Sequence, residues 1–158
     1  MPDSHSATPV LISIDRSQLD QLSTLSNRLD ELTIRLISSY DPITISLVAR
    51  EMQAVANSID LFRAKLLRSY LKAHVTGEVG MIEQGLSGNH LTKLQHLCER
   101  LEATNALLLV ASSPDQLASL ARRYEMIAEQ FVSLLAELRL VYHCASPRRF
   151  AAGGQNRV

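Results

Sequence analysis

The amino-acid sequence predicts an all-α protein, folded as an antiparallel four-helix bundle with coiled-coil-like packing. Between residues 114 and 143, apolar side chains recur at alternating intervals of three and four, the period of one helix face. Aromatic residues make up only 4% of the chain, Trp is absent, and Gly and Pro are few. This composition is typical of helical proteins and disfavours a β-sandwich or β-barrel. At 158 residues the chain can bury a core without a metal or a disulfide.

Residues 15–76 are predicted to form a first helical hairpin. Asp15 is a suitable N-cap for its first helix, with Gln18 completing a capping box three residues later. Asp41 caps the second helix, and Pro42 takes the first helical position, where a missing N–H costs no hydrogen bond. Both helices carry apolar residues spaced by three and four: Leu22, Leu25, Leu29, Leu32, Leu36, and Ile45, Val48, Met52, Val55, Ile59, Phe62, Leu66.

A second hairpin is predicted over residues 89–146. It follows a linker loop at residues 77–88, which holds four of the six glycines and has no lasting apolar period. Asn89 is the expected N-cap of the third helix. Ser113 is the expected N-cap of the fourth, again with a proline, Pro114, at the first helical position.

The two ends of the chain are predicted to lie outside the bundle. Residues 1–14 form an N-terminal extension, and the fourth helix ends around residues 144 to 147, before a flexible tail at residues 147–158. The start has no basic region and an apolar run of only Val10 to Ile14, so it matches neither a signal peptide nor a membrane span. No later stretch approaches the length of about 18 apolar residues needed to cross a bilayer. We therefore expect a soluble, cytoplasmic protein with no membrane partner.

The two predicted hairpins match each other when the chain is shifted by 72 residues against itself. Pro42 then falls on Pro114, and the apolar seam of the second helix falls without a gap on that of the fourth. Outside the seams, several further residues coincide with a residue of the same type: Arg28 with Arg100, Arg50 with Arg122, and Tyr70 with Tyr142. Because any two heptad patterns can be aligned, both an internal duplication and a chance alignment stay open as interpretations.

The apolar seams are expected to form the core of the bundle, with a surplus at one end. In each half the second helix, about 34 residues, is longer than the first, about 24 residues, and so overhangs it by roughly 15 Å. The overhanging ends carry apolar residues that we predict to bind a partner helix: Leu67, Leu71, Val75, Leu140 and Val141. Three arrangements could bury these apolar residues. The two overhanging ends could pack on each other, the N-terminal apolar run could fold back on them, or a second copy of the chain could bind them in a homodimer.

Basic residues accompany this predicted surface, and we assign them to its rim: Arg63, Lys65, Arg68, Lys72, Arg148 and Arg149. They suggest an alternative function, a small regulatory protein that binds nucleic acid through a basic helix end and tail. Against this, the total of 16 basic and 16 acidic residues gives zero net charge, and there is no recognition motif. Basic residues near a helix C-terminus are also favoured by the helix dipole alone.

The sequence predicts no catalytic, cofactor or metal site. His96 and Cys98 are two residues apart and point in different directions on a helix, as do the neighbours His143 and Cys144. Cys98 lies in an apolar seam, where it is expected to behave as a small buried hydrophobe. No pair of carboxylates lies on an apolar face, and no nucleophile or phosphate-loop motif is present. We expect a protein that is not an enzyme.

Asn105 interrupts the apolar seam of the third helix. It is either partly exposed near the end of that helix, or buried as a polar group that fixes the register of the bundle. We favour the exposed interpretation. Taken together, these features predict a non-catalytic, self-associating interaction module, such as a scaffold, an adaptor or a secretion-type chaperone, that binds a partner helix along an apolar groove.

Overall fold

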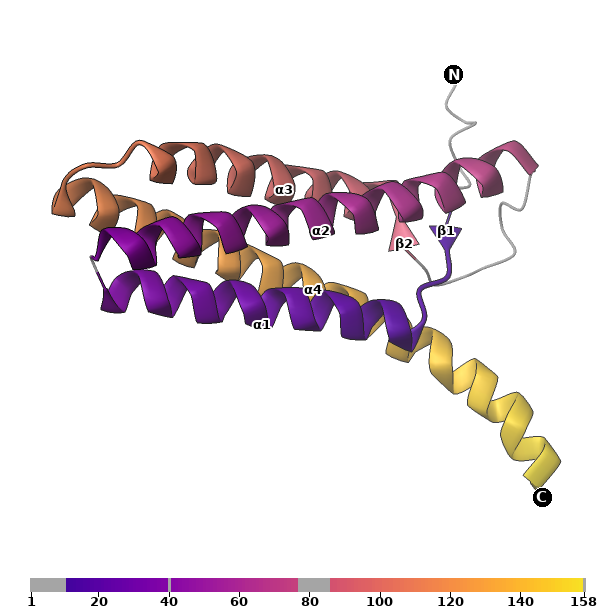
Figure 1. Cartoon of the computed structure of the whole chain (residues 1–158). Coiled ribbons are helices and arrows are strands. Elements are labelled where there is room, and N and C mark those ends of the chain that lie inside the picture. Colours follow the sequence, from indigo (N-terminus) through magenta and orange to yellow (C-terminus); the bar gives the residue numbers. More distant parts are fainter. Residues whose placement is uncertain (1–10, 40, 77–85, 158) are drawn as a thin grey trace.

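The computed structural model describes residues 11–39, 41–76 and 86–157. This part of the chain contains four α-helices and two short strands: β1 (Leu11–Ile12), α1 (Arg16–Ser38), α2 (Pro42–Thr76), β2 (Leu86–Ser87), α3 (Gly88–Leu109) and α4 (Pro114–Arg157). The predicted all-helical class is confirmed, and the helices pack as a bundle in which α1 and α3 each contact both α2 and α4. Figure 1 shows that the α1–α2 and α3–α4 connections lie at the same end of the molecule.

The caps predicted for the first hairpin are present. The backbone N–H of Gln18 donates to Asp15 Oδ1 at 2.8 Å, and the N–H of Asp15 donates to Gln18 Oε1 at 2.9 Å, so both arms of a capping box form. At the start of α2, the N–H of Thr44 donates to Asp41 Oδ2 at 2.9 Å. These bonds satisfy N–H groups that have no partner within the helix, which fixes where each helix begins.

The second hairpin confirms one predicted cap and corrects the other. The N–H of Gln116 donates to Ser113 Oγ at 3.2 Å, as expected for the start of α4. The prediction of Asn89 as the cap of α3 is wrong, because the helix begins earlier and Ser87 is its N-cap. His90 completes this cap by accepting the N–H of Ser87 on Nδ1 at 3.0 Å. The histidine does here what Gln18 does in α1, a role that sequence patterns based on Glu or Gln do not include.

One apolar core runs through the bundle, formed by the predicted seams. Its largest fully buried side chains come from all four helices and from β2: Tyr124, Phe131, Leu22, Leu29, Leu32, Leu36, Met52, Ile59, Leu66, Leu86, Leu94 and Leu101. Burying each such side chain stabilises the fold by roughly 1.5–3 kcal/mol, so the core is the main source of stability.

Burial follows the 72-residue shift throughout the bundle. Every buried residue of α1 corresponds to a buried residue of α3: Leu19, Leu22, Ser26, Leu29, Leu32, Thr33 and Leu36 to Leu91, Leu94, Cys98, Leu101, Thr104, Asn105 and Leu108. From Val48 to Leu66, the buried residues of α2 correspond in the same way to those of α4 between Leu120 and Leu138. The two halves therefore present equivalent inner faces, and the helix starts Pro42 and Pro114 are equivalent too.

The segment before α1 folds back on the end of the bundle opposite the two short connections. β1 pairs antiparallel with β2, with Leu11 facing Ser87 and Ile12 facing Leu86. Ile12, Ile14 and Leu86 are buried, and β1 contacts α2. Of the residues predicted as an N-terminal extension, Ile12 and Ile14 thus belong to the core, and residues 1–10 lie outside the described residues. Of the predicted linker, residues 77–85 also lie outside them.

The predicted end of the fourth helix is wrong. α4 does not stop at residues 144 to 147 but continues to Arg157, which includes all but the last residue of the predicted tail. Pro147 has no N–H to donate and its ring crowds the preceding turn, yet such a residue can bend a helix without ending it. Figure 1 shows the last turns of α4 leaving the bundle at an angle, away from α2.

Candidate interaction surface

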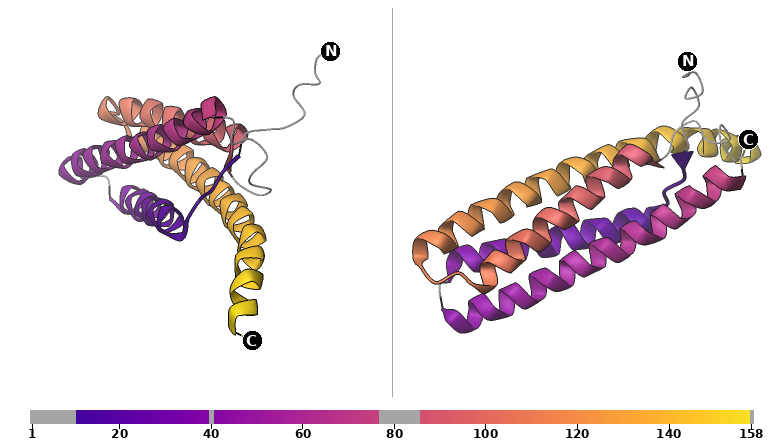
Figure 2. Two further views of the ribbon diagram at one scale, coloured as in Figure 1. Left: turned by 90° about the vertical axis from the view of Figure 1, so that its right-hand side faces the viewer. Right: turned by 90° about the horizontal axis from the view of Figure 1, so that it is seen from above.

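The predicted partner-binding residues differ in how far they are exposed. Leu71, Val75 and Leu140 are exposed by 51%, 83% and 65%. Leu67 packs partly against the core, and Val141 is half-buried. The structure does not bring the predicted residues of α2 together with those of α4, because the C-terminal ends of these two helices diverge (Figures 1 and 2). The overhangs therefore do not cover each other, and the folded-back N-terminal segment covers only one face of the α2 end.

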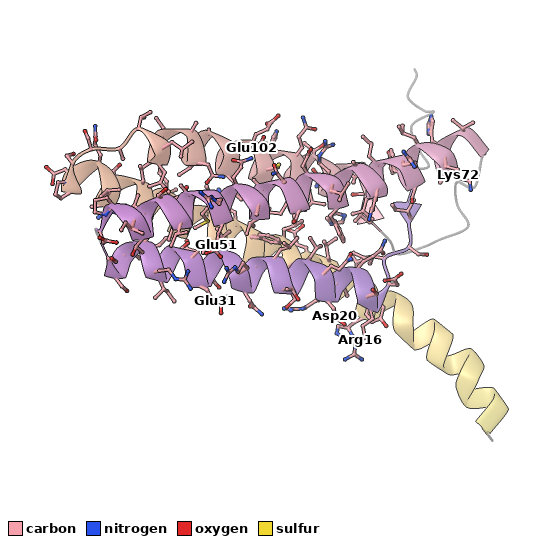
Figure 3. The ribbon with its side chains drawn as sticks, viewed as in Figure 1. Arg16, Asp20, Glu31, Glu51, Lys72 and Glu102 are labelled. Carbon is pink, nitrogen blue, oxygen red and sulfur yellow. The ribbon has the colours of Figure 1, made fainter. Side chains whose placement is uncertain are left out.

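The basic rim is divided in a similar way. Lys65, Arg68 and Lys72 are exposed on α2, and Figure 3 labels Lys72 near the end of this helix. Arg63 is half-buried and forms an ion pair with Asp60 at 3.0 Å, so its charge is locally balanced. The side chains of Arg148 and Arg149 lie outside those described. Among the predicted rim residues whose side chains are described, the exposed positive charge thus lies on the last three turns of α2.

A groove between α1 and α2 was not predicted. It has a volume of about 680 Å³, its apolar lining residues are Leu25, Leu61 and Phe62, and Asp20 and Lys65 are among its polar ones. Leu61 is exposed although it is large and apolar. The signal in the sequence is that Leu61 lies outside the three–four seam, where a soluble helix would normally carry a polar residue.

The equivalent groove between α3 and α4 is smaller and bridged. Its volume is about 260 Å³, and seven of its eight lining residues correspond to lining residues of the α1–α2 groove after the 72-residue shift. Ser133 takes the place of Leu61. Lys93 Nζ donates to both carboxylate oxygens of Glu137, at 2.8 and 3.0 Å, across this groove. The corresponding residues between α1 and α2 are Gln21 and Lys65, which cannot form such an ion pair.

A third groove lies between α1 and α4 and combines apolar and acidic residues. It has a volume of about 460 Å³, and Ile34, Ile37 and Val132 are exposed along it. Three carboxylates also line it: Asp30, Glu125 and Glu129. None of the three has an ion-pair partner in the part of the chain that the structure describes. We name this surface, with its apolar and acidic residues, the α1–α4 groove.

The interface between α2 and α3 corresponds to the α1–α4 groove after the 72-residue shift. It contains a buried hydrogen-bond network. Asn105 is only 2% exposed, so the expectation that it is partly exposed is wrong. Its Oδ1 accepts a hydrogen bond of 2.6 Å from the hydroxyl of Tyr124, and its Nδ2 donates to Gln53 Oε1 at 3.0 Å. Asn105 lies in the last turns of α3, but residues from α2 and α4 cover it. Its equivalent in α1, Thr33, bonds only to the Leu29 carbonyl oxygen of its own helix, at 2.8 Å.

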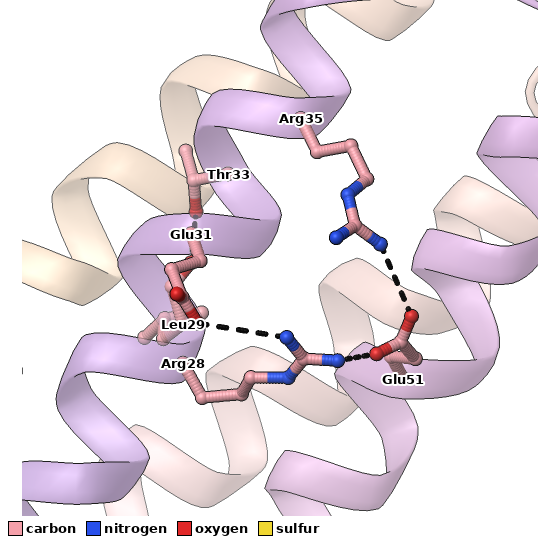
Figure 4. A network of polar contacts seen from close by, with 6 residues as sticks. All are labelled: Arg28, Leu29, Glu31, Thr33, Arg35 and Glu51. Atoms are coloured by element: carbon pink, nitrogen blue, oxygen red, sulfur yellow. Dashed lines mark hydrogen bonds and ion pairs between the residues drawn. The ribbon is translucent and has the colours of Figure 1, made fainter.

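Ion pairs link α1 to α2 on the surface. Glu51 interacts with both Arg28 and Arg35, and Arg28 also approaches Glu31 of its own helix at 3.5 Å (Figure 4). The arginine side chains are 39% and 48% exposed, so solvent screens these pairs and each contributes little to stability. They connect the exposed faces of α1 and α2.

Burial shifts the pKa of Cys98 and of His90, two titratable groups in the bundle. Burial raises the pKa of the Cys98 thiol to about 11, and its Sγ donates to the Ala56 carbonyl oxygen at 3.4 Å. Burial lowers the pKa of His90, with a smaller opposing effect from the Glu137 carboxylate. Among the described residues there is no group of three His, Cys, Asp or Glu side chains that could hold a metal ion.

Comparison with known proteins adds no assignment: no family model, curated protein or solved structure matches this chain. Within residues 11–39, 41–76 and 86–157, no helix has both the length and the apolar character needed to cross a membrane.

Proposed function

We propose that the chain is a non-catalytic protein–protein interaction module that self-associates and binds a partner helix. In this proposal it is a scaffold, an adaptor or a secretion-type chaperone in the cytoplasm, built as an antiparallel, coiled-coil-like bundle of two similar hairpins. The supporting observation is that large apolar side chains stay exposed along two grooves, at the α2 end and on α4: Ile34, Ile37, Val132 and Leu61 in the grooves, Leu71 and Val75 at the α2 end, and Leu140 on α4. Apolar residues gathered along a groove favour association with another apolar surface.

The α2 end would contribute both affinity and orientation. Leu71 and Val75 lie one helical turn apart on the same face and would be buried under the apolar face of the partner. Arg68 and Lys72 lie on that face as well and would select a partner with acidic residues beside its apolar stripe. This arrangement needs neither a cofactor nor a reactive side chain.

The test is a double substitution, Leu71→Asp with Leu140→Asp, at two exposed positions where the fold should tolerate a charge. We expect loss of self-association, measured by sedimentation velocity, and loss of the proteins that co-purify with the wild-type chain. Val110→Asp, at an equally exposed apolar residue near the α3–α4 connection, is the control and should behave as wild type. Unchanged association and unchanged partners in the double variant would contradict the proposal.

A second candidate function is nucleic-acid binding, supported by the three exposed basic residues Lys65, Arg68 and Lys72 on α2. Contacts of Arg and Lys with phosphates release counterions, so such binding weakens steeply as salt increases. Salt-dependent retention on DNA or RNA that is lost in Arg148→Ala with Arg149→Ala would favour this function. Retention that does not weaken as salt increases would exclude it.

A further inference from the structure

We propose that the α2 end of one copy of this chain, residues 68–75, docks in the α1–α4 groove of a second copy. The inference deepens the proposed self-association and rests on it. It identifies the two surfaces that meet, neither of which is the apolar core, and it predicts that opposite charges decide their pairing.

The α1–α4 groove is suited to bind a third helix, because it runs between two helices that both line it. From α1 it is lined by Asp30, Thr33, Ile34 and Ile37, and from α4 by Glu125, Ala128, Glu129 and Val132. Each set has the spacing i, i+3, i+4, i+7, so each is a continuous stripe along one helix face. Each stripe combines acidic and apolar side chains, Asp30 with Ile34 and Ile37 on α1, and Glu125 and Glu129 with Val132 on α4. This suits an amphipathic helix with basic residues beside its apolar ones.

The α2 end presents a stripe of the same spacing: Arg68, Leu71, Lys72 and Val75. Leu71 and Val75 are exposed on it. The opposite face of the same turns is already used, since Leu66 and Ala73 are buried, Tyr70 packs partly against the core, and β1 contacts the helix. The stripe is therefore held facing outward by a rigid, packed helix, and it can dock without first folding.

Length and charge of the two surfaces match. The α2 stripe and each stripe of the groove cover eight residues, which is about 10 Å along a helix axis. The groove carries three carboxylates and no basic residue. The segment from residue 61 to residue 76 carries four basic residues and no acidic one. Docking would place two cations of the stripe beside carboxylates that have no ion-pair partner in the described chain, next to buried apolar contacts.

The α2–α3 interface, which corresponds to the α1–α4 groove after the 72-residue shift, does not repeat this groove. At the positions equivalent to Ile34 and Val132, it has Ala106 and Asp60. Asn105 also bonds across that interface to Gln53. Each copy thus has one basic stripe and one matching groove. Since the stripe and the groove are different surfaces, two copies either form both contacts reciprocally in a closed dimer, or successive copies assemble into an open chain.

An orthogonal charge exchange tests the inference on the full-length chain. One variant reverses the stripe, Arg68→Glu with Lys72→Glu, and the other reverses the groove, Glu125→Lys with Glu129→Lys. All four positions are exposed, so both variants should fold. Each variant alone opposes like charges, and we expect its self-association constant, from sedimentation velocity over a concentration series, to fall at least about tenfold. An equimolar mixture restores opposite charges at both contacts and should associate as strongly as wild type.

Glu99→Lys with Glu102→Lys is the matched control for the groove variant. It changes the net charge by the same amount but on α3, where Figure 3 labels Glu102. Glu102 is equivalent to Asp30 after the 72-residue shift and should be replaceable without effect. The inference is overturned if both charge variants associate as wild type, or if the folded mixture fails to recover. A wild-type chain that stays monomeric at every concentration also overturns it, whereas the interaction-module proposal is tested separately by the partners lost in the Leu71 and Leu140 variant.

Discussion

Replacing Tyr124 by Phe deletes one hydroxyl at the centre of the bundle and leaves the ring in place. The Tyr124 side chain is fully buried, and its hydroxyl donates to Asn105 Oδ1 at 2.6 Å. Burial raises the pKa of Tyr124 well above its ordinary value, so the hydroxyl is protonated and acts as a donor throughout the neutral range. The substitution therefore leaves a buried amide oxygen without a donor.

The expected cost follows from that unsatisfied oxygen. A buried polar group that loses its partner destabilises the folded state by about 1–3 kcal/mol, so we expect Tyr124→Phe to lower the free energy of unfolding by about 2 kcal/mol. Asn105→Leu, which leaves the Tyr124 hydroxyl unpaired, should have a similar cost. The double variant removes both partners and should cost clearly less than the sum, with a coupling energy of about 1 kcal/mol or more.

Urea denaturation followed by circular dichroism measures these free energies. Tyr142→Phe is the control, because it deletes the same atom from a half-buried tyrosine for which the described chain provides no hydrogen-bond partner. It should change stability by less than about 0.5 kcal/mol. A Tyr124→Phe variant as stable as this control, or additive effects in the double variant, would refute the interpretation of Asn105 as a buried, fully bonded group.

Three further predictions concern helix ends and helix stability. Burial in the folded state lowers the pKa of His90, so the unfolded state binds the proton more readily and stability should fall as pH drops below about 6.5. In His90→Gln, the loss of stability between pH 7.5 and pH 5, measured by urea denaturation, should be smaller than in wild type. Asp41→Ala removes the cap of α2 and should cost about 1 kcal/mol in a thermal or urea melt. Hydrogen exchange should be faster for amides of α1 than of α3, because open grooves flank α1 on both sides, whereas Lys93 and Asn105 tie α3 to α4 and α2.

The helix starts could be predicted because their causes are local. Asp15, Asp41 and Ser113 each accept a hydrogen bond from the backbone N–H three residues ahead. Because this separation is short and constant, the residue type at the capping position is enough to predict the helix start. The same method failed at α3, where the capping partner is His90, a residue type outside the usual pattern. It also failed at the end of α4, which was predicted around residues 144 to 147 although the helix continues to Arg157.

The candidate surface was only partly predictable. The sequence singled out Leu71, Val75 and Leu140, which are exposed, because their helices are longer than the other two. It could not show that the ends of α2 and α4 diverge, since that depends on the angle between helices. The grooves were missed, and their signal was available only as apolar residues outside the seams, such as Ile34 and Leu61.

The sequence by itself determined the helical class, the core-facing side of each helix and most helix starts, since those depend on neighbours within one or two turns. Only the tertiary structure decided that Ile12 and Ile14 fold into the core and that Asn105 is buried. It also decided that α1 borders open grooves while its counterpart α3 is bridged. Those outcomes depend on contacts between residues far apart in the chain, such as Asn105 with Gln53 and Lys93 with Glu137, whose pairing no local period encodes.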